Sequence, residues 1–530
     1  MKKECDKMPA SGERMNESLE CSEAAMRVCG AASLHGRETT IGNVMHGGKL
    51  PSECTTIIVG EEQSADGAKY LCRSSDFDAL MSINIEVHED TQFGPVEFVA
   101  KDSKFRCPLP KEALGYTALP DYQFPGEWGS AGFNTAGVGM SSTETIFSSQ
   151  KALDCDPYVE DGLAENCTFN IVLPYIRTAR EGVARLGKLI EQYGSAEGFG
   201  IGFIDNKEIW YLENACGHHW LACRMPKDKY FVTGNQSRFR EYDPCDKENF
   251  MASPRLIEFA VEHGLCCGDM LQHEGKTDEG KMKFDFHEAY SRDEQLDTTY
   301  NYPRVWGLQQ MFTPSMKNDV AVNTFPVFAK ADSPITLDGL RAAFRFHYDN
   351  TSHDPYLHEN GKEPYRPVSI FRTTQTHIMQ VRKSLPDSIG HIVYVAMGMG
   401  DLSVFLPLYQ GVKSFPSLYT NVASGECRDN SAYWRFRKVM TLGMTDYNSF
   451  APIIKSAYRR LEAENDLLQR DMESEYMRVY KDDPQQAQAL LQQFSDKVLS
   501  RAIEVADGLV DELFTRLTAK IQEEYLFHGA

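Results

Sequence analysis

The chain has 530 residues, of which 42% are hydrophobic and 11% aromatic, and its formal net charge is −21 at pH 7. This apolar content is enough for a large core, which excludes an intrinsically disordered protein. The acidic excess argues against a nucleic-acid binder and against a protein held on anionic lipid, because both need a basic surface. No run approaches the roughly 20 apolar residues of a membrane span.

The first part of the chain differs from the rest, because residues 1–53 are polar and show no sustained periodicity. They lack the apolar segment of a secretory signal, so we interpret them as a leader, which is either a propeptide that is removed or an upstream extension of the reading frame. Without export we expect a cytoplasmic protein whose fourteen irregularly spaced cysteines stay reduced. Residues 54–450 are predicted to form the main domain, and residues 451–530 are predicted to form two amphipathic helices packed on it.

The main domain begins with a predicted β-hairpin. Residues 55–60 (TTIIVG) read as a strand, an Asp-Gly turn follows, and residues 68–73 read as the returning strand. Cys54 stands immediately before the first strand. The pairing would bring Arg73 and Asp76 back toward Cys54.

Further helices and strands are predicted along the chain. The spacing of apolar residues predicts a helix over Leu173–Tyr193, and a hairpin is predicted around Asp205-Asn206. Lys229–Asn235 (KYFVTGN) and His391–Met397 (HIVYVAM) are predicted strands, and Ser253 is the expected N-cap of a short helix. Strands come in hairpins and helices in separate blocks, which favours an α+β fold of antiparallel sheets covered by helices.

A metal site is a candidate at ACGHHWLAC, which contains Cys216, His218, His219 and Cys223. In a strand, alternate side chains point to opposite faces, so these four do not easily close one tetrahedron. Side chains packed on a sheet are therefore the better interpretation. The adjacent Cys266-Cys267 pair has no ligand spacing either, and we expect neither a metal nor a cofactor.

The arrangement around Cys54 predicts a different chemistry. A cysteine at the start of a strand, an Arg-x-x-Asp at the end of the paired strand and an asparagine at the end of a later strand are the parts of an N-terminal-nucleophile hydrolase. Cleavage before Cys54 would free an α-amino group with a pKa near ~7.7–8.0, which can act as general base for the thiol of the same residue, whose ordinary pKa is ~8.5.

The chain resembles the bacterial dipeptidase A family of cysteine peptidases, which is related to penicillin V acylases and bile-salt hydrolases. The resemblance spans Cys54 to the C-terminal helices, and its segments occur in the order of the family. They are CTTIIVG, DG and RSSDFD at the start, and then GFNTAGVGMSSTET, DPYVEDGLAE, LPYIRTAREGV, IWYLENACGHHWLACRMP, RPVSIFRTTQTHI and SVFLPLY. It implies a four-layer αββα sandwich of two antiparallel sheets, with added C-terminal helices.

The resemblance also implies roles for particular residues. Cys54 matches the nucleophile, and Arg73 and Asp76 match the pair that supports the thiolate and holds the new amine. Asn235 resembles the asparagine whose side-chain amide helps to form the oxyanion hole. Taken singly, such residues are more often a buried cysteine, a surface ion pair and a turn, but together and in family order they favour a catalytic role.

Three further residues are candidates whose roles we assign as follows. Arg304, in NYPRVW, is the candidate for a second active-site arginine. Glu144, in SSTET, is a candidate to pair with a substrate amine, from its charge and position. His377 is interpreted as structural, because the amine of the nucleophile already supplies the base.

The predicted activity is a dipeptidase that hydrolyses short peptides with a free N-terminus through a thioester on Cys54, after cleavage of Glu53-Cys54. Two alternatives stay open, namely an acylase of other linear amides and a non-catalytic, secernin-like regulatory protein. We expect short-peptide substrates and a homo-oligomer, and no nucleic-acid or membrane partner.

Overall fold

The computed structural model describes residues 53–123, 126–266, 284–357, 365–421 and 423–526. Residues Pro51–Ala530 group into one compact unit. The predicted leader lies outside the described residues except for Glu53, and so does Cys267. Within the described ranges, no helix is long and apolar enough to cross a membrane.

Two antiparallel sheets form the centre of the fold, and β1 and β2 of the first contact β8 and β9 of the second. The seven-stranded sheet has the order β14 (Phe328–Ala329), β12 (Tyr230–Thr233), β1 (Glu53–Val59), β2 (Lys69–Asp76), β15 (Thr373–Val381), β16 (His391–Met397) and β17 (Leu406–Tyr409). The six-stranded sheet has the order β13 (Phe250–Ala252), β11 (Trp220–Arg224), β10 (Ile209–Asn214), β9 (Phe199–Ile204), β8 (Gly139–Thr145) and β7 (Ala131–Phe133). Two short pairs join β3 (Glu86–His88) to β6 (Tyr116–Ala118) and β4 (Glu97–Val99) to β5 (Arg106–Pro108).

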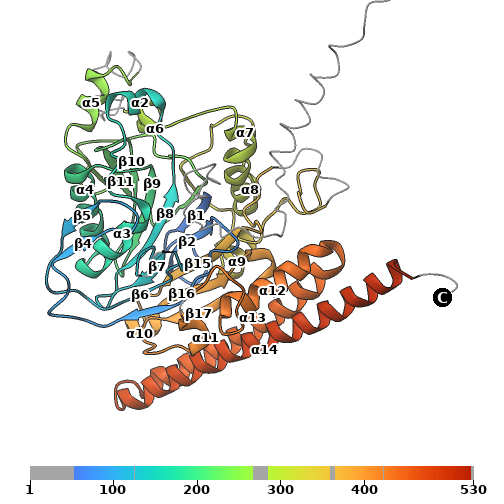
Figure 1. Ribbon diagram of the computed structural model, residues 1–530. Coiled ribbons are helices and arrows are strands. Elements are labelled where there is room, and N and C mark those ends of the chain that lie inside the picture. The colour runs from blue at the N-terminus through green and yellow to red at the C-terminus, as the bar shows by residue number, and fades with distance from the viewer. Residues whose placement is uncertain (1–52, 124–125, 267–283, 358–364, 422, 527–530) are drawn as a thin grey trace, which may run out of the picture. The chain divides into compact units, whose positions relative to one another are not determined.

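Helices cover the outer face of each sheet (Figure 1). On the six-stranded sheet lie α3 and α4, and the seven-stranded sheet is covered by α8, α9, α12 and α14, so the layers are αββα as expected. The helices are α2 (Gln150–Cys155), α3 (Glu165–Val172), α4 (Ala179–Tyr193), α5 (Leu256–Glu262), α6 (Phe286–Tyr290), α7 (Asp297–Tyr300), α8 (Tyr302–Phe312), α9 (Leu337–Ala343), α10 (Asp387–Gly390), α11 (Ser417–Thr420), α12 (Ala432–Thr445), α13 (Tyr447–Val479) and α14 (Pro484–Glu524), with 3₁₀ turns η2 (Leu173–Tyr175) and η4 (Gly400–Leu402).

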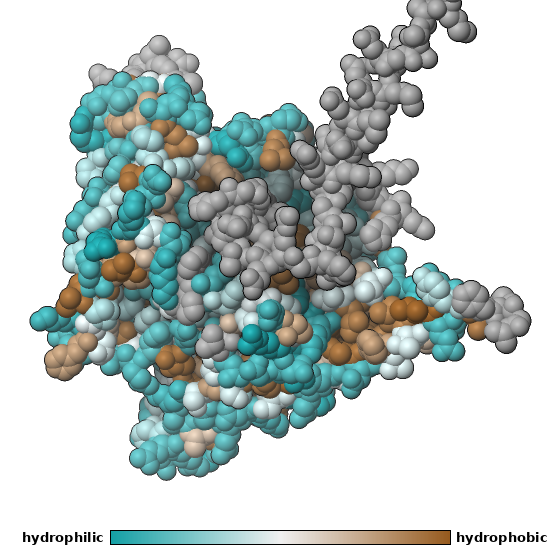
Figure 2. All heavy atoms as spheres, viewed as in Figure 1, coloured by the Kyte–Doolittle hydropathy of each residue, from teal (hydrophilic) through white to brown (hydrophobic). Residues whose placement is uncertain are grey.

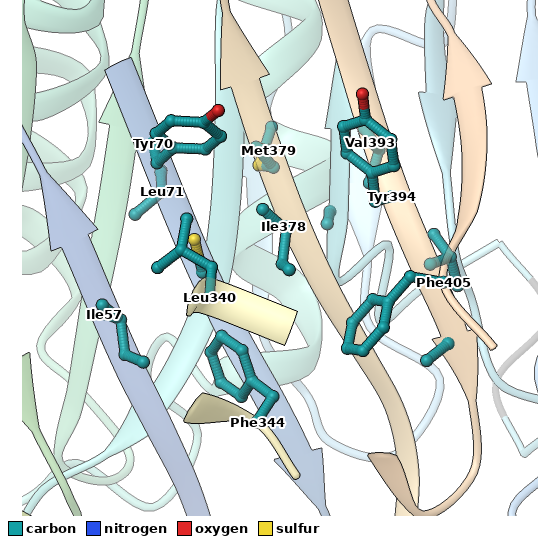
Figure 3. Packing of buried hydrophobic residues seen from close by; sticks show 14 of the residues in the cluster. Ile57, Tyr70, Leu71, Leu340, Phe344, Ile378, Met379, Val393, Tyr394 and Phe405 are labelled. Carbon is teal, nitrogen blue, oxygen red and sulfur yellow. The ribbon is translucent and has the colours of Figure 1, made fainter. Parts of the chain in front are cut away.

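The alternation of side chains along β1 and β2 fills both faces of their sheet. Ile57 lies on the face covered by Leu340 of α9 and by Phe344, the residue that follows this helix (Figure 3). Leu71 points the other way, toward the six-stranded sheet, where a Cβ added to Gly202 would stand 2.5 Å from its Cδ1. The two sheets therefore approach closely next to the strands that carry the predicted site.

The C-terminal helices form as predicted, and α13 begins at Tyr447, so the predicted domain boundary after residue 450 falls in its first turns. The buried apolar residues of α14 include Leu491, Phe494, Val498, Ala502, Leu509 and Leu513. Figure 2 shows a mainly hydrophilic surface on one face of the molecule, with hydrophobic residues gathered near the C-terminal part of α14. Phe514 and Ile521 are exposed there.

Two predicted helix starts are wrong. The helix predicted from Leu173 begins at Ala179, because the side chain of Thr178 caps it by accepting from Glu181 N, and Pro174 lies in the preceding 3₁₀ turn. Ser253 caps no helix, since its hydroxyl accepts from the Trp220 backbone N–H and contacts His219 instead. In both cases a polar contact that the local sequence pattern did not predict replaces the expected helix start.

Candidate active site

Cys54 lies at the start of β1, between the two sheets. Its backbone pairs with Ser75 of β2, and its side chain is 1% exposed. Cys54 and Thr56 share the face that points toward β8, because alternate residues of a strand point the same way. The Cys54 thiol donates to Thr143 O over 3.3 Å, and the Thr56 hydroxyl donates to Glu144 Oε2 over 2.6 Å.

Arg73 reaches the thiol from β2. Its Nη1 donates to Cys54 Sγ over 3.1 Å, and the guanidinium is held by the carbonyl oxygens of Ser142 and Thr143. Burial raises the pKa of the Cys54 thiol to about 12, while Arg73 lowers it and nearby carboxylates raise it further. In the uncleaved chain the thiol is therefore protonated at neutral pH, and Arg73 favours the thiolate.

Asn235 and Arg304 hold the backbone of Cys54. The Asn235 side-chain Oδ1 accepts from Cys54 N over 3.3 Å and from Arg304 Nη2 over 2.8 Å, and its Nδ2 donates to Thr145 O over 3.0 Å. Arg304 also donates to Cys54 O, and to Thr55 Oγ1 over 3.0 Å. The structure thus brings Cys54, Arg73, Asn235 and Arg304 together.

Asn301 positions Asn235 and Arg304, and the sequence analysis did not identify Asn301. Its Oδ1 accepts from Asn235 N over 3.2 Å and from Arg304 Nη2 over 2.6 Å, and its Nδ2 donates to Asn235 O over 3.2 Å. Gly234 leaves room for the guanidinium, since a Cβ there would stand 2.9 Å from Arg304 Cζ and Nη2. The one signal in sequence was the Asn-Tyr-Pro that starts α8.

Asp76 lies beside the nucleophile, opposite Glu53 in the β1–β2 pairing. Its carboxylate accepts from Arg366 Nη2 and Thr373 Oγ1, both over 2.6 Å, and from Ser74 Oγ over 3.1 Å. The residue predicted to hold the new amine is thus bound to its neighbours, while Asn235 is the acceptor at the Cys54 nitrogen. The role of Asp76 stays a prediction, and Arg366 is a second residue that the sequence did not reveal.

Glu144 lies on β8 and is fully buried. It contacts Thr56, which is two residues after the nucleophile on β1. Burial raises the pKa of Glu144 to about 8, although the hydrogen bond from Thr56 and the charges of Arg304 and Arg73 lower it. Its other oxygen, Oε1, is buried without a hydrogen-bond partner among the described residues. Glu144 is mostly neutral at neutral pH in the uncleaved chain, and its predicted contact with a substrate amine is untested.

His377 has structural contacts, in line with the prediction. Its ring lies 2.8 Å from Ser141 Oγ and 3.1 Å from Gln375 Oε1, and burial, followed by the charge of Arg73, lowers the pKa of His377 well below its ordinary value. It is therefore neutral.

The candidate metal residues of the ACGHHWLAC segment also have other contacts. His218 binds Asp156 over 2.8 Å, and His219 binds Ser253 over 2.9 Å. No group of three potential ligands stands close enough to hold a metal ion in the part of the chain that the structure describes.

Comparisons with known proteins identify the family of the chain. A family model described as "Peptidase family C69" matches residues 53–460, so the match begins one residue before Cys54. A "Probable dipeptidase" from Salmonella dublin is 47% identical over 365 residues, which cover 68% of this chain and 82% of that protein. "Probable dipeptidase B" from Lactococcus lactis subsp. lactis is 33% identical over 76% of this chain and 83% of its own length.

"Dipeptidase A" from Lactobacillus helveticus is 29% identical over 88% of this chain and 98% of its own length. A crystal structure of a variant of conjugated bile acid hydrolase from Clostridium perfringens has 14% identity and a TM-score of 0.25, over 65% of this chain and 89% of that one, which is too weak a likeness to carry an argument. The family match covers well over half of the chain, and on that basis the chain belongs to peptidase family C69.

Proposed function

We propose that the chain is a cysteine-type dipeptidase that hydrolyses short peptides with a free N-terminus, with Cys54 as an N-terminal nucleophile. The observation that carries this proposal is the hydrogen bond of 3.1 Å from the Arg73 guanidinium to Cys54 Sγ. Cys54 is the second residue of the segment that matches a peptidase family. The names of the relatives, dipeptidases from several bacteria, support peptide bonds as the bonds cleaved.

Cleavage of the Glu53-Cys54 bond creates the general base. In the uncleaved chain the Cys54 nitrogen belongs to an amide, which donates to Asn235 Oδ1 over 3.3 Å. After cleavage the same nitrogen is an amine with a pKa near ~7.7–8.0, so at neutral pH a useful fraction is unprotonated. Asn235 Oδ1 then holds this amine next to its own thiol, where the amine takes the thiol proton.

Hydrolysis proceeds in two halves. The Cys54 sulfur attacks the scissile carbonyl carbon, and the carbonyl oxygen becomes an oxyanion that accepts from Asn235 Nδ2, which carries a second hydrogen besides the one bound to Thr145 O, and from backbone N–H groups. The Cys54 amine gives its proton to the leaving nitrogen, the C–N bond breaks and a thioester remains. Water then attacks the thioester with the amine as base and regenerates the thiol.

The other expectations keep the status of predictions. They are the division into a leader (1–53), a catalytic domain (54–450) and C-terminal helices (451–530), the homo-oligomer, the absence of nucleic-acid and membrane partners, and the cytoplasmic location.

The test is an intact-mass measurement on the purified chain, followed by hydrolysis assays with dipeptides, tripeptides and penicillin V. We expect a polypeptide that begins at Cys54 and hydrolyses dipeptides, and Cys54→Ser without turnover. Cys245→Ser, which changes an exposed cysteine, is the matched control and should keep full activity. Hydrolysis of penicillin V alone would make the protein an acylase, and a chain that starts at Cys54 and cleaves none of these substrates would make it non-catalytic.

A further inference from the structure

A group of arginines surrounds the end of β1 that carries the nucleophile. Arg73 and Arg304 contact Cys54 itself, and Arg366 contacts the Asp76 carboxylate. Arg372 donates through Nη1 to the carbonyl oxygens of Asp76 and Phe77, over 3.0 and 3.1 Å. This concentration of positive charge is local, since the whole chain has a net charge of −21.

Tyr300 joins three of these arginines. The guanidinium carbons of Arg304 and Arg366 lie 5.3 and 5.7 Å from the centre of its ring, and Arg372 Nη2 lies 3.4 Å from its hydroxyl. The side chains of Arg73, Arg304 and Arg366 are buried, whereas Arg372 and Tyr300 are partly exposed. Arg372 and Tyr300 therefore form the partly exposed edge of the group.

The proposed mechanism fixes the side on which the leaving residue lies. The Cys54 amine has to reach the leaving nitrogen, so the leaving residue stands on the amine side of the nucleophile. In the uncleaved chain Glu53 occupies that side, and its partner in the β1–β2 pairing is Asp76. Arg372 donates to the carbonyl oxygen of Asp76 and so lies next to the position that cleavage empties.

We propose that Arg372, together with the Tyr300 hydroxyl, binds the free α-carboxylate of the leaving residue and so restricts hydrolysis to dipeptides. This inference rests on the proposed function. In a dipeptide the carboxylate follows the leaving nitrogen after a single Cα, whereas a longer peptide has a neutral amide at that place. The contacts of Arg372 with the carbonyl oxygens of Asp76 and Phe77 orient its guanidinium. Arg372 Nη2 and the Tyr300 hydroxyl then supply the hydrogen-bond donors to the substrate carboxylate.

The chemistry of the side chain suits this role. A guanidinium forms shorter and stronger hydrogen bonds to a carboxylate than to a neutral carbonyl, because both partners are charged. Burial lowers the pKa of Arg372 to about 10, so the side chain still carries its charge at neutral pH. The discrimination is therefore between a charged and a neutral group at one position.

The test compares a dipeptide with its C-terminal amide, by kcat and KM, in the processed wild-type enzyme and in Arg372→Gln. We expect the wild type to prefer the free acid by about 10- to 100-fold in kcat/KM, the range of a charge-assisted hydrogen bond. Arg372→Gln should lose this preference through a higher KM for the acid, with kcat/KM for the amide unchanged. Arg372→Lys should recover part of it.

Arg180→Gln is the matched control. Arg180 also donates to two consecutive backbone carbonyl oxygens, those of Lys247 and Glu248, and lies over an aromatic ring, that of Trp210. It projects from the start of α4 on the six-stranded sheet, so its substitution should leave both substrates unaffected.

The outcomes separate the two proposals. Equal loss for acid and amide in Arg372→Gln, or equal hydrolysis of both by the wild type, would overturn the role of Arg372 alone. Hydrolysis of neither substrate by the processed wild type would overturn the proposed function. If Arg372→Gln does not fold, product inhibition of the wild type decides, because a free amino acid should inhibit more strongly than its amide, and equal inhibition would refute the inference.

Discussion

The hydrogen bond from Arg73 to the thiol predicts a measurable shift in the pKa of Cys54. The two atoms are 3.1 Å apart, and both side chains are buried. Coulomb's law at an effective dielectric constant of about 20 gives about 5 kcal/mol at this separation, but the net value of a hydrogen bond to a charged group is smaller, about 1.5–3 kcal/mol. At 1.36 kcal/mol for each pKa unit, Arg73→Gln should raise the pKa of Cys54 by about 1–2 units.

The assay is the rate of alkylation of Cys54 by iodoacetamide as a function of pH, followed by mass spectrometry of the processed enzyme. The sign follows from the chemistry, because Arg73 favours the thiolate, which is the reactive form, and its loss moves the profile to higher pH. Arg73→Lys keeps the charge and should shift the profile less. An unchanged profile in Arg73→Gln, or a shift to lower pH, would refute the assigned role of Arg73.

Further predictions concern turnover, maturation and stability. Cys54→Ser should abolish measurable turnover with unchanged far-UV circular dichroism, because a hydroxyl is the weaker nucleophile at neutral pH; normal hydrolysis would exclude Cys54 as the nucleophile. Asn235→Ala should lower kcat by about 10²-fold with a smaller effect on KM, and a change in KM alone would move Asn235 into the binding pocket. N-terminal sequencing of active enzyme should begin CTTIIVG, and Cys54→Ala should keep the leader if the thiol cleaves Glu53-Cys54 itself; full activity with the leader attached would disprove the mechanism. Burial raises the pKa of Glu144 from 4.5 to about 8, so the folded state favours the neutral carboxyl, and the stability that this form contributes is lost as pH rises through that range. The melting temperature of Glu144→Gln minus that of the wild type should therefore increase between about pH 5 and pH 9, and a constant or falling difference would contradict the burial of Glu144.

The sequence predicted the parts of the site that depend on strand periodicity. A strand, a turn and a returning strand define which residues pair, and the pairing of β1 with β2 brings Arg73 onto the same face as Cys54. The strand that ends near Gly234-Asn235 was equally readable, since glycine and asparagine follow an apolar run. The resemblance then selected which of these side chains were candidates for chemistry.

The residues that the sequence did not reveal come from segments without a period. Asn301 lies at the start of α8, and Arg366 and Arg372 precede β15, so their places depend on how loops pack over the end of the seven-stranded sheet. An arginine in a loop resembles an ordinary surface residue in sequence. Its burial and its contacts with Asp76 became visible only with the tertiary structure.

One geometric feature connects the proposed maturation with the proposed specificity. Cleavage at Glu53-Cys54 converts an amide nitrogen into a base, and it also removes the residue that occupies the amine side of the nucleophile, opposite Asp76. Under the proposed mechanism, the uncleaved chain would lack both the base and the space for a leaving residue, and we expect it to be inactive for both reasons. Asn235 Oδ1 accepts from the Cys54 nitrogen in the uncleaved chain, and the proposed mechanism keeps this contact after cleavage, so cleavage requires no rearrangement of the site around Cys54.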